Sequence, residues 1–189
     1  LGDIFVKGGK TVTITQSVTN TTVNETNIQG DVSVIGTADT TTVTVNQKAT
    51  ATASSTGLGV VGVTAGAVTI TDKNAASTTA AGTIATVTLN SAGAATINSG
   101  ALSTLNLQGK LVTVDAGTSG ALTVPAVTTL GLNLTGASST GAVTIDSDVT
   151  TLNISGNTTA STLASLVATP RHSSARQCYL PKMNHVAQF

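Results

Sequence analysis

Residues 66–109 read GAVTITDKNAASTTAAGTIATVTLNSAGAATINSGALSTLNLQG and repeat one three-residue pattern. An aliphatic residue, then Thr or Asn, then a second aliphatic residue are followed within a few positions by Gly, Ser, Asn or Asp. Such a triplet is typical of a β-strand that buries alternate side chains and ends in a turn. The triplets of this stretch are Val68-Thr69-Ile70, Val87-Thr88-Leu89, Ala95-Thr96-Ile97 and Leu105-Asn106-Leu107.

The spacing of the triplets, which continue downstream, indicates how the strands are arranged. Their polar centres lie at positions 69, 88, 96, 106, 113, 123, 133, 144 and 153. After the first interval, strands start about every 7 to 11 residues and alternate strands about every 17 to 21. One interpretation is a parallel β-solenoid, resembling a right-handed β-helix, with two or three short strands in each coil of about 20 residues. The alternative is an antiparallel β-sandwich.

The shortage of aromatic residues favours the solenoid. The chain has no Trp, one Tyr and two Phe, and no aromatic residue lies between Val6 and Cys178. A sandwich of this size normally fills the space between its sheets with large aromatic side chains. A solenoid has a thin interior that Val, Ile, Leu and Ala can fill coil by coil. The sequence therefore predicts an all-β, parallel β-solenoid.

Composition narrows the possible function. Charged residues make up 8 % of the chain, against the usual quarter, and the formal net charge is zero. Thr contributes roughly a fifth of the residues, as is typical of secreted bacterial surface proteins. The repetitive part carries only Lys48, Lys73 and Lys110 as cations. Binding of nucleic acid or of a membrane surface is therefore not expected, because both need clustered basic residues.

The cysteine content, the apolar runs and the first residues of the chain bear on disulfides, metal sites, membrane insertion and processing. The single cysteine, Cys178, cannot form an internal disulfide, and no Cys/His cluster has zinc-ligand spacing. No run of about 18 apolar residues could form a transmembrane segment. The chain begins with Leu1 and without a basic and apolar leader, which we interpret as the sign of a fragment or a processed chain.

Three regions are expected. Residues 1–30 form an N-terminal cap or the first coils, 31–168 the β-solenoid repeat domain, and 169–189 an atypical basic tail. Residues 159–168 fit a single helical turn or a further strand. The tail holds both histidines, the only arginines and no acidic residue. We interpret it as a capping tail, a vector-derived or frameshifted end, or a partner-binding peptide.

Three stretches resemble the repetitive β-region of bacterial surface-layer proteins, most closely those of the Caulobacter type. They are residues 66–109, 40–53 (TTTVTVNQKATATA) and 150–168 (TTLNISGNTTASTLASLVA), and the resemblance covers roughly residues 31–168. It implies export by a type I secretion system, calcium-assisted folding outside the cell and assembly into a two-dimensional lattice. The implied role is structural, at the bacterial cell surface, with other copies of the chain and cell-surface polysaccharide as partners.

Calcium is the cofactor that this resemblance implies, although the family's glycine- and aspartate-rich nonapeptide and its secretion signal are missing from the chain. Calcium takes six to eight oxygen ligands, normally with several carboxylates. The best local candidates are Asp146 and Asp148 in TIDSDVT, which would share one face of an extended strand. The alternative for this pair is a solvated turn, and turns are also expected at Asp31, Asp72 and Asp115.

No catalytic or cofactor-binding residue is predicted, and the chain is not expected to be an enzyme. A Ser-His-Asp arrangement would need His172 or His185 from the tail, and no GxSxG motif is present. Solenoid enzymes that act on polysaccharides pair two carboxylates and add aromatic or basic residues that bind the sugar, and the middle of this chain lacks those residues.

Two further non-enzymatic functions fit the same repeats. Ice binding would use rows of Thr-x-Thr, such as those at residues 11–15, 40–45 and 86–88. Such rows must recur at a constant coil length, and the spacing in this sequence drifts by several residues. The other function is an adhesin stalk, which would carry a separate binding tip.

Overall fold

A computed structural model of the chain describes residues 1–20, 26–51, 62–117, 127–146, 148–157 and 161–168. Within these ranges every regular element is a β-strand, which confirms the all-β prediction. The strands are β1 (Ile4–Lys7), β2 (Thr11–Asn20), β3 (Thr26–Ile28), β4 (Val32–Ile35), β5 (Thr42–Ala51), β6 (Gly62–Thr64), β7 (Val68–Thr71), β8 (Thr86–Asn98), β9 (Thr104–Gly117), β10 (Thr129–Ser139), β11 (Ala142–Ile145), β12 (Thr151–Asn157) and β13 (Ser165–Ala168).

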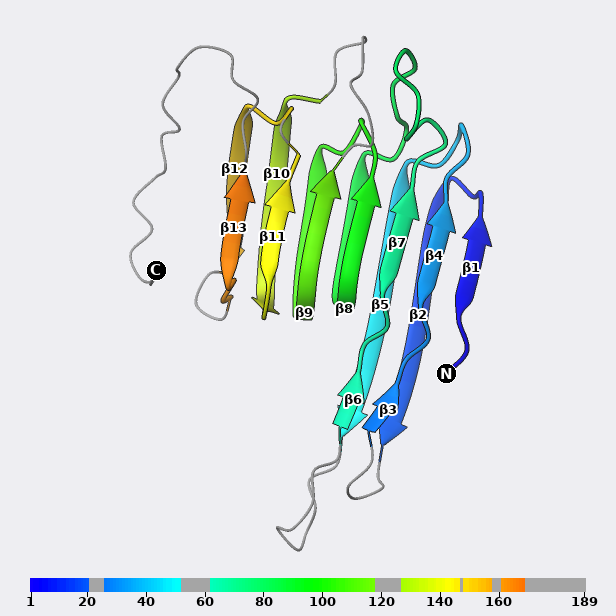
Figure 1. Ribbon diagram of the computed structural model, residues 1–189, viewed down its shortest axis with the longest axis vertical. Coiled ribbons are helices and arrows are strands. Elements are labelled where there is room, and N and C mark those ends of the chain that lie inside the picture. The colour runs from blue at the N-terminus through cyan, green and yellow to red at the C-terminus, as the bar shows by residue number, and fades with distance from the viewer. Residues whose placement is uncertain (21–25, 52–61, 118–126, 147, 158–160, 169–189) are drawn as a thin grey trace, which may run out of the picture.

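The strands form two facing layers, and all pairings among the described strands are parallel. The near layer in Figure 1 has the order β1-β4-β7-β8-β9-β11-β13, and the far layer has the order β2-β5-β8-β9-β10-β12. The long strands β8 and β9 belong to both layers. The chain rises in the near layer, descends in the far layer and advances from β1 to β13, which is a right-handed path (Figure 1). This is a parallel β-solenoid and not an antiparallel sandwich.

The coils are less regular than the sequence predicts. Ala95 pairs with Val114, 19 positions further on, which fits the predicted coil of about 20 residues. Ile4, however, pairs with Val32, and Val32 pairs with Val68, which correspond to coils of 28 and 36 residues. The paired strands keep their register even so, and part of the extra length lies in the long strands β2 and β5 and in the short strands β3 and β6.

One corner of the coil has no connecting loop. The triplets at residues 87–89 and 95–97, predicted as separate strands, lie in the single strand β8. The bend between them has Ser91 at φ 61°, beside Gly109 of β9 at φ 65°. A Cβ at Gly109 would lie 2.5 Å from the Ser91 Oγ, so only glycine fits there. The paired strands shift register at this corner, as at a β-bulge.

Aliphatic side chains from both layers form one core between them. Inward residues such as Ile70, Leu89 and Leu107 are completely buried. Each contributes about 1.5–3 kcal/mol relative to an exposed position. Val112 is an exception to the triplet pattern, because the corner turns it outward and buries Leu111 in its place.

The ends of the described chain extend the same architecture. β1, β2 and β3 form a first coil that pairs with β4, β5 and β6. Of the two alternatives for residues 159–168, the strand is found, as β13. The tail predicted at residues 169–189 and the triplet at 122–124 lie outside the described residues. The described part of the chain contains no helix that could cross a membrane.

Candidate functional site

Asp146 and Asp148, the predicted calcium ligands, lie in a turn that follows β11. The Asp146 amide donates to the Ala116 carbonyl at 2.9 Å, and the Asp148 amide donates to Asp146 Oδ1 at 2.8 Å. The Val149 amide donates to the Asp146 carbonyl at 3.2 Å. Of the two predicted arrangements, the turn is therefore found, and the expectation that the two residues share a face of an extended strand is wrong.

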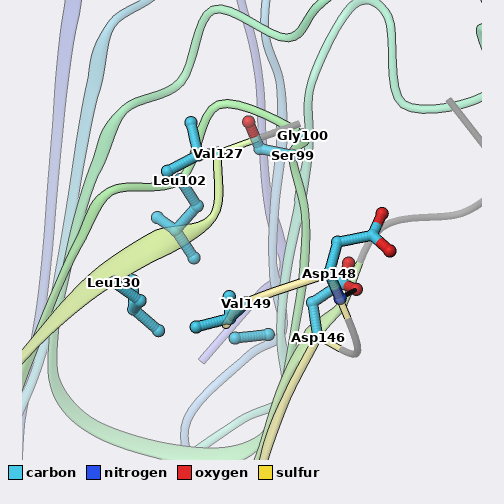
Figure 2. Close-up of a pocket in the computed structure, with 9 residues that line it drawn as sticks. Ser99, Gly100, Leu102, Val127, Leu130, Asp146, Asp148 and Val149 are labelled. Carbon is cyan, nitrogen blue, oxygen red and sulfur yellow. Dashed lines mark hydrogen bonds between the residues drawn. The ribbon is translucent and has the colours of Figure 1, made fainter. Parts of the chain in front are cut away.

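A small cavity lies beside this turn. Its volume is about 20 Å³, enough for one water molecule and too small for an organic substrate. Figure 2 shows Leu102, Leu130 and Val149 together on its apolar side, with the Asp148 carboxylate pointing away from them. The cavity is lined by Ser99, Gly100, Leu102, Ala116, Val127, Leu130, Asp146, Asp148 and Val149.

The aspartate turn by itself does not match the ligand set of calcium. Within the described residues, no three Asp, Glu, His or Cys side chains gather closely enough to hold a metal ion. Two carboxylates supply fewer oxygens than the six to eight that calcium takes. Calcium binding at Asp146 and Asp148 therefore stays a prediction from the sequence, and further oxygens would have to come from elsewhere.

The carboxylate of Asp72, a residue expected from the sequence only to form a turn, accepts several hydrogen bonds. Its Oδ1 accepts the Asn74 amide at 2.9 Å. Its Oδ2 accepts the amides of Thr83 at 2.6 Å and Ile84 at 2.7 Å, and the Ser99 hydroxyl at 3.0 Å. Burial raises the pKa of this carboxyl, but these hydrogen bonds together outweigh burial and hold the pKa below the ordinary 3.8.

Asp72 therefore serves as a structural anion, since it fastens the connection between β7 and β8 to the core. The Asx turn to Asn74 could be inferred from the sequence, because an aspartate after a strand commonly forms one. The bonds to Thr83, Ile84 and Ser99 span 11, 12 and 27 positions and have no local signal in the sequence.

An open groove of about 640 Å³ lies between the connections that follow β4 and β7. Its charged residues are Lys7, Lys73 and Asp39, all exposed, and Asp72, whose two carboxylate oxygens already accept hydrogen bonds. Two cations face two anions, so the groove has no net charge that would select a ligand. Its lining is Lys7, Ile35, Gly36, Thr37, Ala38, Asp39, Thr71, Asp72, Lys73, Ala75 and Ala76.

Threonines stand in register on the outward face of the far layer. The same Thr-Val-Thr triplet occurs in β2, β5 and β8 (residues 11–13, 42–44 and 86–88), and the three triplets pair residue by residue. Thr104 of β9 pairs with Thr86 and extends one row. We call these residues the threonine array: Thr11, Thr13, Thr42, Thr44, Thr86, Thr88 and Thr104. The drift in coil length, which weighed against such rows in the sequence, does not disturb them.

An amide ladder continues from the array toward the C-terminal end of the far layer. Asn106 Nδ2 donates to Thr88 Oγ1 at 3.0 Å, and Asn133 Nδ2 donates to Asn106 Oδ1 at 2.7 Å. The Ser155 hydroxyl donates to Asn133 Oδ1. These side chains satisfy one another, whereas the hydroxyls of the other six array threonines have no intramolecular partner within the described residues.

Exposed apolar side chains gather at the two ends of the coil. Leu1, Phe5 and Ile28 belong to the first coil, and Leu166 and Val167 belong to the last described strand. Among the described residues, Val112 is the one exposed large aliphatic side chain away from these ends.

No family model matches this sequence, and no characterised protein matches it at a significant level. The resemblance to bacterial surface-layer proteins therefore stays a prediction from the residues.

Proposed function

We propose that this chain is a structural segment of a surface-layer-type assembly at the bacterial cell surface. In this role it carries no catalytic site, and its principal partners are other copies of itself. The parallel solenoid supports the proposal because its stiffness comes from stacked coils and it needs no bound substrate. The Thr- and Asn-rich outer faces suit an extracellular lattice whose contacts are neutral.

The observation that carries the proposal is the chemistry of the two ends of the coil. β1 and β2 at one end, and β12 and β13 at the other, each pair on one side only with another described strand. Such strands offer unpaired backbone groups for pairing with another chain. Phe5 and Val167 are exposed at these edges. A second copy stacked end to end would extend both layers and cover apolar surface.

Electron microscopy and sedimentation of the purified chain would test this assembly, with and without millimolar calcium. We expect filaments or sheets, and we expect Phe5→Lys to raise the concentration needed for assembly by about tenfold or more, because a lysine at a sheet edge opposes pairing. Val112→Lys is the matched control, since it adds the same charge at an exposed apolar position within the stack. A chain that stays monomeric at every concentration, with calcium present, would contradict the proposal and would favour the adhesin stalk.

Calcium assistance has its own test. The double variant Asp146→Asn with Asp148→Asn removes both predicted carboxylate ligands and keeps their size. We expect it to assemble as well as the native chain without calcium and to lose the additional assembly that calcium gives. Equal calcium responses of the two proteins would exclude this turn as the site.

A further inference from the structure

We propose that the threonine array on the far layer is an ice-binding face, a function that goes beyond surface-layer assembly and does not depend on it. The evidence is the residue-by-residue pairing of three identical Thr-Val-Thr triplets from β2, β5 and β8. No register shift interrupts these pairs. The outward threonines therefore form a two-dimensional grid of equivalent groups.

The grid has repeats set by the geometry of a parallel sheet. Neighbouring threonines in a row belong to adjacent strands and lie about 4.8 Å apart, and threonines two residues apart in one strand lie about 6.7 Å apart. Water molecules on the faces of hexagonal ice repeat at similar distances in two directions. The array can therefore hold several water molecules at ice-like positions at once.

The side chains are suited to ordering water. Threonine is stiff about χ1, so each hydroxyl and methyl group has a fixed direction before ice arrives, and little conformational entropy is lost on binding. In the described structure, six of the seven array hydroxyls lack an intramolecular partner and are available to water. Thr88, the seventh, accepts the hydrogen bond from Asn106.

The array is also uncharged and accessible. Thr11 and Thr13 are exposed, and the threonines of β5 and β8 are partly exposed between neighbouring strands. Lys10 directly precedes Thr11 at one margin of the grid, and Lys48 lies four positions beyond Thr44 along β5. Hydrated ions would disturb an ice-like layer, so a grid whose seven residues are all neutral, with lysines only beyond its margins, favours contact with ice.

The near layer provides an internal comparison. Its outward row contains Thr69, Thr96 and Thr144 in register, but Asp115 of β9 interrupts the row. Within the described residues, the near layer has only this one row of threonines. The positions two residues further along its strands include Asn98 and Asp146 in place of threonine. The near layer therefore lacks the second dimension of the grid.

The test is thermal hysteresis with observation of single ice crystals, at protein concentrations below assembly. We expect the native chain to shape ice crystals and to separate melting from freezing. Thr44→Tyr, at the centre of the array, should reduce hysteresis at least fivefold, because the ring would hold the ice surface away. Thr96→Tyr in the near layer is the matched control and should leave hysteresis unchanged.

Circular dichroism must show that both variants keep their strands. If Thr44→Tyr fails to fold, Thr44→Val takes its place, since valine keeps the shape and removes the hydroxyl. Native protein that neither shapes ice nor shows hysteresis would overturn the proposal. Equal losses in the Thr44 and Thr96 variants would overturn it too, because the effect would then not belong to the array. Neither result would bear on end-to-end assembly.

Discussion

The interior between the two layers is aliphatic along most of the coil and polar between its first two turns. Val43, Leu89 and Leu105 belong to the aliphatic part and are completely buried. Further along β2 and β5, the inward positions hold Gln16 and Gln47, which are equally buried. Gln29, from the segment before β4, completes this glutamine cluster. The same alternation of inward and outward residues thus produces two chemically different interiors.

The glutamine cluster is held by specific hydrogen bonds that the aliphatic part lacks. Gln47 Nε2 donates to Gln16 Oε1 at 2.9 Å, and Gln29 Nε2 donates to the Lys48 carbonyl at 3.1 Å. Three buried atoms, Gln16 Nε2, Gln29 Oε1 and Gln47 Oε1, have no partner in the described protein. Aliphatic residues stabilise any register that keeps them inside, whereas these amides match one register only. We infer that the aliphatic part supplies stability and the cluster supplies alignment of the first two coils.

The largest expected effect comes from a cavity in the aliphatic part. Leu105→Ala removes a completely buried side chain between β8 and β10. We expect a loss of about 2–5 kcal/mol in the free energy of unfolding, because the packed coils cannot collapse into the space. Urea denaturation followed by circular dichroism would measure it.

Val112→Ala is the control for that measurement, since it truncates an aliphatic side chain that is 45 % exposed. We expect it to change stability by less than about 0.5 kcal/mol. Similar losses in the two variants would show that the core does not lie between the layers.

A second prediction concerns Asp72, a buried polar group that, unlike the glutamines, is fully satisfied. Asp72→Asn replaces an oxygen that accepts several donors with an NH₂ group that cannot accept, and should cost about 1.5–3 kcal/mol. Because its pKa is lower in the folded chain, ionised Asp72 stabilises the fold above about pH 4, the unfolded-state value. This stability is lost as the pH falls through the lower, folded pKa.

The pH dependence gives the control for Asp72. Denaturation of the native chain and of Asp72→Asn should be compared between neutral pH and about pH 2. The difference in the free energy of unfolding between the native chain and Asp72→Asn should shrink as the pH falls. A difference that stays constant over this range would mean that the charge of Asp72 does not stabilise the fold.

The aliphatic part of the interior could be predicted from the sequence because its information is local. Alternation within each triplet identifies inward residues such as Ile70 and Leu107, whatever the length of the coil. The corner at Ser91 and Gly109 could not be predicted, because it depends on which strands lie side by side. The same holds for the Thr13–Thr44–Thr88 row, since its alignment depends on connections of different lengths that the sequence alone does not resolve. The candidate aspartates were found as a pair, and a turn was predicted as one alternative for them, but the bond from the Asp146 amide to the Ala116 carbonyl has no local signal in the sequence.

The smallest effect is expected within the glutamine cluster and tests its role in alignment. Gln29→Met keeps the length of the side chain but leaves the part-buried Lys48 carbonyl without this donor, which should cost about 1–2 kcal/mol. Gln108→Met on the outward face of β9 is the matched control and should change stability by less than about 0.5 kcal/mol. Hydrogen exchange of the β2 and β5 amides would separate alignment from stability. We expect Gln29→Met to speed exchange in these strands more than in β9 and β10. Uniform acceleration along the coil would show instead that the cluster contributes only to global stability, as the aliphatic part does.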